Sequence, residues 1–211
     1  MRIQASNLGK TYRKGKNNIE VIKDFCHAFE AGKMYLLKGA SGKGKTTLLS
    51  ILGLLDDPTY GDLSIDGRVL DFSDKNTLCS IRKERYSFVF QDYALFENLS
   101  VFENLKLIYE DTKEKFDGKK IDDLLQKMNL AHRKHHRTAE LSGGEKQRLA
   151  FARALLKDAE IFICDEPISN VDEGNAQIII ELLKELKKTK LVIVTCHTSV
   201  FDDICDEIVE L

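Results

Sequence analysis

The chain has 211 residues, of which 32 are Lys or Arg and 34 are Asp or Glu, giving a formal net charge of −2. This length suits one α/β domain with a real core, and we expect residues 1–211 to form a single domain. A charge so near zero gives no overall electrostatic reason to bind nucleic acid or anionic lipid, so we expect no nucleic-acid partner. No stretch approaches the roughly 18 consecutive apolar residues of a membrane-spanning helix, which predicts a soluble, cytoplasmic protein. Five scattered cysteines without a CxxC pair fit reduced thiols in the cytosol.

The first predicted elements are strands with one buried face. Apolar and polar residues alternate over 2–8 and again over 21–29, which predicts an antiparallel β region at the N-terminus. A short apolar run at 34–37 then leads into a glycine-rich turn and the helical pattern of 46–55. The order strand, turn, helix is the setting in which a phosphate-binding loop is found.

That turn carries a phosphate-loop motif. Residues 39–46 read GASGKGKT and satisfy G-x-x-x-x-G-K-[ST]. Glycines let the backbone curl so that its N–H groups face phosphate oxygens at a helix N-terminus, whose dipole favours an anion. We expect Lys45 to contact the β and γ phosphates and Thr46 to place its hydroxyl on Mg²⁺. The motif predicts binding of a nucleoside triphosphate without identifying the class of enzyme.

The middle of the chain is predicted to be helical. After a strand-like stretch at 61–67 and an apolar run at 87–90, apolar residues recur at helical spacing from 101 to about 130. We expect a helical subdomain over approximately 92–157. Within it, residues 141–145 read LSGGE just before another helical pattern, and taken alone this is an ordinary loop and helix cap.

The last third alternates strand and helix. Apolar runs at 161–164 and 191–195 flank a helical pattern at 175–188, and this βαβ order predicts a parallel sheet with right-handed crossovers. Asp165 and Glu166 follow the first of these runs, where a phosphate-loop enzyme places its Mg²⁺-binding aspartate. The expected fold class is therefore α/β, a P-loop NTPase core with a mainly parallel sheet.

Together these motifs resemble the ABC ATPase family over the whole chain, each present once and in order. The matching segments are the Walker A loop at 39–46, the Q-loop at Gln91, the signature at 141–145, the Walker B strand at 161–166, the D-loop at 169–172 and the switch histidine at His197. Tyr12 resembles the aromatic residue that stacks on adenine. The resemblance implies a RecA-like core, an N-terminal antiparallel β-subdomain and a helical signature subdomain.

The resemblance also implies a role for each matched residue. Asp165 would hold Mg²⁺ through water, and Glu166 would orient or deprotonate the attacking water. Gln91 would touch metal and water, and His197 would donate a hydrogen bond to the γ-phosphate. Val21 would add apolar contact beside the base. Taken alone, Tyr12 could be a solvent-facing strand-end residue, Gln91 a solvated loop residue and His197 structural.

The expected site thus has three overlapping sets of residues. The catalytic set is Glu166, His197, Gln91 and Lys45, and the metal set is Thr46, Gln91 and Asp165. The set expected to bind ATP is Tyr12, Val21, Gly39, Ala40, Ser41, Gly42, Lys43, Gly44, Lys45, Thr46, Thr47, Gln91, Asp165, Ser142, Gly143, Gly144 and Glu145. The last four would reach ATP held by a second copy of the chain, so the resemblance implies an ATP-dependent homodimer.

Glu145 and Asn170 indicate a subgroup. Many family members carry glutamine at the position of Glu145. LSGGE with an asparagine in the D-loop resembles the subgroup of bacterial macrolide, lipoprotein-release and peptide or bacteriocin exporters, together with the cell-division ATPase of the same type. We therefore expect a subunit that powers a separate membrane-spanning permease exporting peptide, drug or lipoprotein, and that contacts the inner face of the cell membrane only through it. A mechanotransmission ATPase that moves no substrate is the alternative. A DNA-repair, translation or iron–sulfur-assembly ATPase is disfavoured, because the sequence has no long coiled-coil insertion and no basic face.

Two further features are left without a role in this resemblance. Lys43 is unusual in the phosphate loop and adds positive charge near the phosphates. His132, His135 and His136 have spacing that a metal could use, but they lie in a basic run and we expect them to be solvated.

Overall fold

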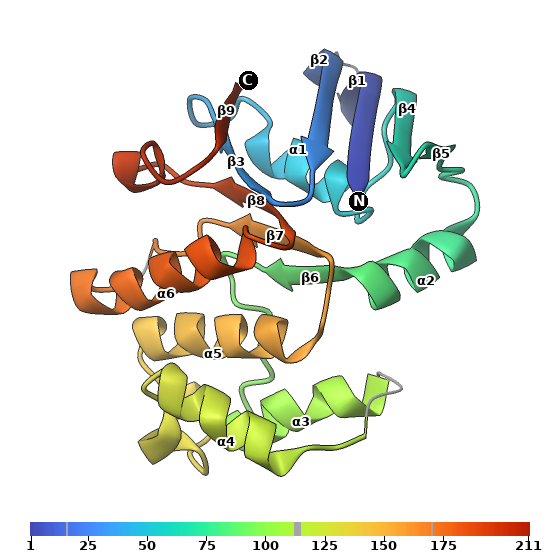
Figure 1. The fold of residues 1–211 in the computed structure, drawn as a ribbon. Helices are drawn as coiled ribbons and strands as arrows, with labels where there is room; N and C mark the ends of the chain where they lie inside the picture. Colours follow the sequence, from blue (N-terminus) through green and yellow to red (C-terminus); the bar gives the residue numbers. More distant parts are fainter. Residues whose placement is uncertain (16, 112–114, 170) are drawn as a thin grey trace.

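The computed structural model describes residues 1–15, 17–111, 115–169 and 171–211, and it has a layered α/β architecture (Figure 1). Two sheets lie in the half that holds both termini, and helices fill the opposite half. Within the described residues, no helix is long and apolar enough to cross a membrane. Asn170, which the sequence assigns to the D-loop, lies outside the described residues.

The expected antiparallel region is confirmed as a sheet with strand order β2-β1-β4-β5. Its strands are β1 (Arg2–Lys14), β2 (Asn17–Glu30), β4 (Tyr60–Ile65) and β5 (Arg68–Val69). The β1–β2 hairpin is longer than the alternation predicts. Register shifts between Ala5 and Thr11 explain this, because each bulge resets the period-two pattern that marks a strand.

The expected parallel sheet is also confirmed, with strand order β6-β7-β8-β3-β9. Its strands are β3 (Lys33–Lys38), β6 (Tyr86–Val89), β7 (Ile161–Asp165), β8 (Leu191–Thr195) and β9 (Glu207–Glu210). Every residue of β7 and β8 is buried, as expected of central strands covered on both faces.

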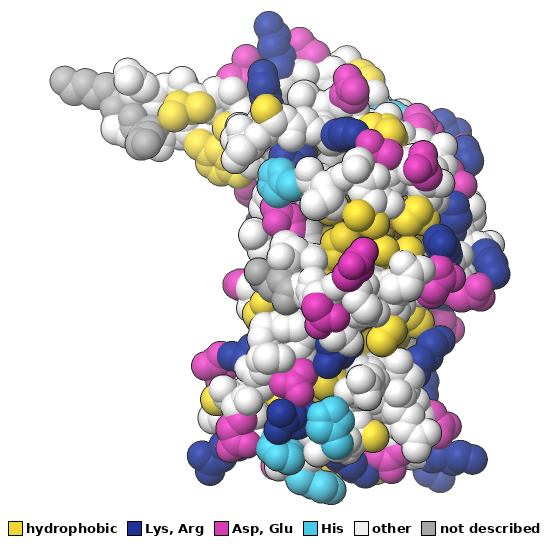
Figure 2. Space-filling model, turned by 90° about the vertical axis from the view of Figure 1, so that its left-hand side faces the viewer, with side chains coloured by type: hydrophobic (Ala, Val, Ile, Leu, Met, Phe, Trp, Pro, Cys, Tyr) yellow, Lys and Arg dark blue, Asp and Glu magenta, His cyan; other side chains and the backbone are white. Residues whose placement is uncertain are grey.

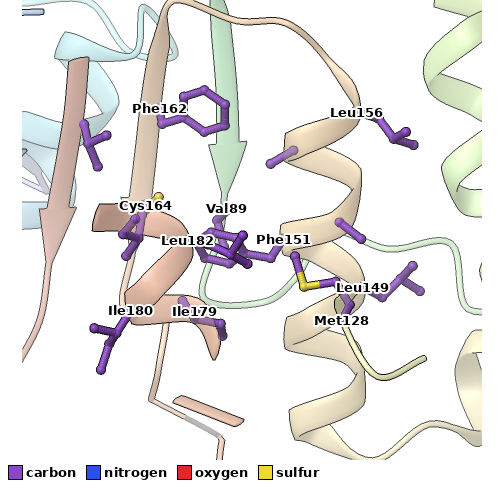
Figure 3. Close-up of a cluster of buried hydrophobic side chains, with 14 of the residues drawn as sticks. Val89, Met128, Leu149, Phe151, Leu156, Phe162, Cys164, Ile179, Ile180 and Leu182 are labelled. Atoms are coloured by element: carbon purple, nitrogen blue, oxygen red, sulfur yellow. The ribbon is translucent and has the colours of Figure 1, made fainter. Parts of the chain in front are cut away.

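Two hydrophobic cores lie on opposite faces of this sheet. Alternate residues of a strand enter different cores: Phe162 and Cys164 of β7 enter one, and Ile161 and Ile163 enter the other. The second core includes helix α1 (Lys45–Leu52) and the antiparallel sheet. The first includes α5 (Gly143–Leu156) and α6 (Glu173–Leu186), whose side chains converge on it in Figure 3. The sheet therefore holds the phosphate-loop helix and the signature helix on opposite faces.

The predicted helical region contains α3 (Val101–Asp111), α4 (Gly118–Lys127) and α5, which lie in the lower half of Figure 1. Short 3-10 helices occur at Ala131–Arg133, Thr138–Glu140 and Ser199–Phe201. The division into one domain with a subdomain over approximately 92–157 stays a prediction.

One helix is absent from the sequence predictions. Helix α2 (Lys75–Arg85) buries Leu78 as its one buried residue, so it carries little of the apolar periodicity that marks a helix. The local signal is its N-cap, where the Asp74 carboxylate accepts a hydrogen bond from the Thr77 backbone N–H at 3.1 Å.

Candidate nucleotide site

The phosphate loop ends in a helix whose N-terminus has no side-chain cap. Gly44 occupies the cap position with φ of 89°, and the first turn of α1 contains no acidic residue. A side chain at this position would also collide with the strand behind it, since a Cβ on Gly44 would lie 2.8 Å from Val21 Cγ1. The backbone N–H groups of this turn are therefore available to an anion, and the helix dipole favours one.

Lys45, at the start of α1, curls back over the loop. Its Nζ donates hydrogen bonds to the carbonyl oxygens of Gly39 at 2.7 Å and Ala40 at 3.2 Å. These bonds hold the ammonium group within the loop. The positive charge that is predicted to contact the phosphates is therefore already positioned there.

A cavity of about 430 Å³ opens in front of this loop. The residues that line it are Val21, Ser41, Gly42, Gly44, Lys45, Thr46, Thr47, Gln91, Asp165, Glu166 and His197. The loop thus faces the carboxyl ends of β6, β7 and β8, where ligands bind in open α/β sheets.

Two adjacent strand ends build the acidic side of the cavity. Asp165 and Thr195 are register partners at the ends of β7 and β8. The Thr195 hydroxyl donates to Asp165 Oδ1 at 2.5 Å and accepts from the Glu166 backbone N–H at 3.0 Å. Thr195 is a site residue that the sequence motifs do not predict, and it is identified by its position opposite Asp165 in the sheet.

Glu166 has a backbone conformation that few side chains adopt. Its φ is 48°, in the left-handed region, which costs free energy that the surrounding contacts must offset. Its carboxylate lies between two of the predicted residues: His197 Nε2 is 2.8 Å from Oε1, and Gln91 Nε2 donates to Oε2 at 3.3 Å. Glu166, His197 and Gln91, far apart in the sequence, therefore meet at one carboxylate.

Tyr12 lies on β1 just outside the residues that line the cavity. Its side chain is exposed, at 41%, while its hydroxyl donates to Asp56 Oδ2 at 2.6 Å. Partial burial and this bond raise the pKa of Tyr12, whereas a hydrogen bond with Thr47 acts in the opposite direction. Tyr12 is thus next to Thr47, a residue of the cavity wall.

The signature residues do not line the cavity of their own chain. Ser142 caps α5, and its side chain accepts from the Glu145 backbone N–H at 3.3 Å, while the Glu145 carboxylate accepts from the Ser142 backbone N–H at 2.8 Å. This capping box fixes the start of the helix. In Figure 1, α1 and α5 both run from left to right, so both N-termini point toward the left-hand side, which is the face shown in Figure 2.

Both carboxylate oxygens of Glu145 are engaged within the subunit. Arg133 Nε donates to the second oxygen at 2.8 Å. Burial alone would raise the pKa of Glu145, but the backbone N–H of Ser142 and the Arg133 guanidinium lower this pKa to about 2. The geometry therefore favours Glu145 as a residue that holds the signature loop rather than one that touches phosphate.

The predicted nucleotide residues fall into two groups. Most are gathered at the cavity, whereas Tyr12, Gly39, Ala40, Lys43, Ser142, Gly143, Gly144 and Glu145 are not among the residues that line it. Figure 2 shows the face toward which the N-termini of α1 and α5 point. Hydrophobic side chains are collected in the middle of this face, and histidines lie at its lower end, in the half that holds the helices. His132, one of the histidines in the basic run, lies 3.8 Å from Glu145.

The cavity also suits a magnesium ion that is shared with a bound phosphate. Among the described residues, no group of three or more His, Cys, Asp or Glu side chains could hold a metal by itself. The hydroxyl-bearing Thr46 and the carboxylate of Asp165 both line the cavity. One or two oxygen ligands with substrate phosphates and water are the usual setting for Mg²⁺.

Comparison with known proteins supports the family suggested by these features. A family model described as ABC transporter matches residues 22–169. The macrolide export ATP-binding/permease protein MacB of Bartonella henselae is 33% identical over 208 residues, covering 97% of this chain and 32% of that protein. The MacB protein of Bdellovibrio bacteriovorus is 35% identical over 196 residues, covering 92% of this chain and 30% of that protein. The chain spans about a third of the length of these relatives.

Two solved structures of MJ0796 are similar over nearly the whole chain. One is a dimeric structure of this bacterial ABC transporter cassette, with a TM-score of 0.92 and 32% identity. The other is a dimeric post-hydrolysis state of the same cassette bound to ADP and Pi, with a TM-score of 0.92 and 31% identity. Each match covers 99% of this chain and 94% of the other. The chain therefore belongs to the ABC transporter family, as one of its ATP-hydrolysing cassettes.

Proposed function

We propose that two copies of this chain bind Mg-ATP between them and that each ATP is held by the phosphate loop of one copy and the signature loop of the other. The observation that carries this proposal is that Ser142, Gly143 and Gly144 do not line the cavity of their own chain. Their helix nevertheless points its N-terminus toward the same side of the molecule as the phosphate-loop helix does (Figure 1). A second copy turned to face this one would bring the missing helix N-terminus to the γ-phosphate.

The residues around Glu166 support a hydrolytic mechanism. Glu166 is the base that accepts a proton from a water molecule as the water oxygen forms a bond to the γ-phosphorus and the bond to the β–γ bridging oxygen breaks. Gln91 orients the same water, and His197 donates to the γ-phosphate. Lys45 and the loop N–H groups hold the transferred group in line. Bound Mg²⁺, held by Thr46 and Asp165, would neutralise charge that develops on the phosphates.

Two substitutions test these roles separately. Lys45→Ala removes the ammonium group of the loop and should weaken ATP binding, whereas Glu166→Gln should abolish phosphate release and retain ATP. Binding measured with a fluorescent ATP analogue and release of phosphate distinguish the two defects. Lys188→Ala is the control, because Lys188 lies just after the end of α6 in an exposed ion pair with Glu185, and neither residue lines the cavity. Normal hydrolysis by Glu166→Gln would reject Glu166 as the base.

We further propose that the cassette acts at the inner face of the cell membrane and powers a separate membrane-spanning permease that exports peptide, drug or lipoprotein. The support comes from relatives whose names describe macrolide export and an ATP-binding/permease chain. Co-purification with a permease, and stimulation of ATP hydrolysis by it, test the partnership. Transport measured in vesicles that contain both proteins tests export. Stimulated hydrolysis without any movement of cargo would instead indicate a mechanotransmission ATPase.

A further inference from the structure

We propose that Asp56 positions the ring of Tyr12 for the adenine base and that Lys10 fixes the Asp56 carboxylate for this task. Asp56 belongs to none of the family motifs that the sequence carries, and it does not line the nucleotide cavity. The proposal rests on the proposed stacking role of Tyr12 and adds the residue that makes this aromatic side chain rigid.

Two side chains donate hydrogen bonds to the Asp56 carboxylate. Tyr12 Oη donates to Asp56 Oδ2 at 2.6 Å, and Lys10 Nζ donates to Asp56 Oδ1 at the same distance. The ammonium group of Lys10 also lies 4.9 Å from the centroid of the Tyr12 ring, within cation–π range. One side chain thus holds the tyrosine hydroxyl, while another lies over one face of its ring.

The burial of Lys10 makes this arrangement informative. Lys10 is 9% exposed, and a buried ammonium group is costly unless it is paired. Asp56 supplies the charge, and the carbonyl oxygen of Asp57 accepts a second hydrogen bond from Lys10 at 2.6 Å. Although partial burial acts the other way, the hydrogen bonds from Lys10 and Tyr12 lower the pKa of Asp56. The carboxylate is therefore ionised and fixed at neutral pH.

Asp56 also connects the base site to the phosphate site. It lies in the turn that follows α1, where the N–H groups of Leu55 and Asp56 donate to the Ser50 carbonyl at 2.8 and 3.3 Å. The opposite end of α1 is the phosphate loop. Tyr12, on a different strand, is therefore tied to the helix that holds the phosphates, so the spacing between base and triphosphate is fixed before ATP arrives. Such preorganisation lowers the entropy cost of binding.

Two variants test the contact without removing the aromatic ring. Tyr12→Phe deletes the hydroxyl that Asp56 accepts from and leaves the Lys10–Asp56 ion pair in place. Asp56→Asn removes the charge at nearly constant volume. We expect each to raise the KM for ATP by about 3- to 10-fold, the size of effect that loss of one charge-assisted hydrogen bond can produce, with kcat unchanged. Binding of inorganic tripolyphosphate, which has no base, should not change.

Asp57→Asn is the matched control, because it makes the same change one residue away. The Asp57 carboxylate pairs with Lys75, whose side chain is 62% exposed. Loss of this exposed pair should leave the KM for ATP unaltered. The double variant with Tyr12→Phe and Asp56→Asn should raise the KM no further than the more affected single variant, since Tyr12→Phe already removes the contact through which Asp56 acts on the ring. A purely structural role for Asp56 predicts a lower Tm with unchanged KM, and that result would overturn the proposal.

The stacking role of Tyr12 has its own test. Tyr12→Ala should raise the KM for ATP more than Tyr12→Phe does, because it deletes the ring. If Tyr12→Ala raises the KM while Tyr12→Phe and Asp56→Asn do not, the positioning role of Asp56 is rejected and the stacking role stands. An unchanged KM for Tyr12→Ala would reject stacking itself, and the positioning role of Asp56 with it.

Discussion

Thr195 is the residue on which the two acids of the site depend. One hydroxyl group donates to the Asp165 carboxylate and accepts from the Glu166 backbone N–H. The second contact supports a residue whose φ of 48° is unfavourable for any side chain with a Cβ. The hydroxyl thus holds Asp165, the proposed metal ligand, and Glu166, the proposed base, in one arrangement across two neighbouring strand ends.

Thr195→Val removes both hydrogen bonds of the hydroxyl and should lower the rate of ATP hydrolysis by about tenfold or more, since the loss of about 1.4 kcal/mol from one buried hydrogen bond already corresponds to tenfold. Valine keeps the shape and the β-branched side chain, so β8 should fold normally. Steady-state phosphate release measures the rate, and circular dichroism verifies the fold. A rate equal to that of the unsubstituted chain would show that the acids hold their positions without Thr195.

Glu145 stabilises the signature loop only while it is ionised. Its pKa is lowered from 4.5 to about 2 in the folded chain, so its contribution is complete above pH 4.5 and is lost as pH falls toward 2. The cause is its capping bond to Ser142 and its ion pair with Arg133. This pH dependence is expected of a carboxylate whose pKa is lower in the folded than in the unfolded chain.

Glu145→Gln should keep the capping bond and lose the ion pair. We expect the free energy of unfolding at pH 7 to fall by about 1 kcal/mol, with ATP hydrolysis retained. Urea unfolding of both forms between pH 7 and pH 3 should show the difference shrinking below pH 4.5. A difference that stays constant across this range would mean that the charge of Glu145 does not contribute.

At the scale of elements, α5 holds the loop that follows β6. Arg153 Nη2 donates to the Tyr93 carbonyl at 2.9 Å, and Nη1 donates to the Ala94 carbonyl. Both loop residues have positive φ, of 64° and 46°. This pair of strained residues lies just after Gln91, so the signature helix sets the conformation of the segment that carries the glutamine.

Arg153→Met should therefore affect turnover more than ATP binding. It keeps an unbranched apolar side chain but leaves two carbonyl groups without their guanidinium donor, and we expect kcat to fall about 3- to 10-fold with little change in KM. Lys184→Met is the control, because Lys184 makes an exposed pair with Glu181 on α6. If kcat is unchanged in Arg153→Met, the loop does not depend on this contact.

The elements differ in how far the sequence predicts them. Central strands such as β7 and β8 are short apolar runs buried on both faces, so composition alone identifies them. Helix α2 escapes prediction because most of its residues are polar or charged, with Leu78 its one buried residue and Ile81 partly buried against the core. The β1–β2 hairpin is underestimated because its bulges break the alternation.

The same contrast holds for the site. Local motifs predict the phosphate loop and the two acids, because the residues of each motif are neighbours in the sequence. Thr195 and Asp56 are absent from those motifs. Their roles depend on register between β7 and β8 and on a hydrogen bond between β1 and the turn after α1, which only the folded chain brings together.

At the scale of the whole molecule, the parallel sheet separates the phosphate-loop helix from the signature helix. Its two cores anchor α1 on one face and α5 on the other, and both helices point their N-termini toward the same side of the molecule (Figure 1). The signature residues Ser142, Gly143 and Gly144 are not among those that line the cavity of the same chain. The proposed dimer, in which each copy completes the site of the other and ATP forms part of the interface, is compatible with this arrangement.

The state of association of Glu166→Gln, measured by light scattering with and without Mg-ATP, tests this shared site most directly. Because the variant should bind ATP without hydrolysing it, we predict a dimer with Mg-ATP and a monomer with Mg-ADP or no nucleotide. Adding Ser142→Arg to Glu166→Gln should restore the monomer in ATP, since a bulky side chain would block the helix N-terminus of the signature. A Glu166→Gln chain that binds ATP and stays monomeric would contradict the shared site.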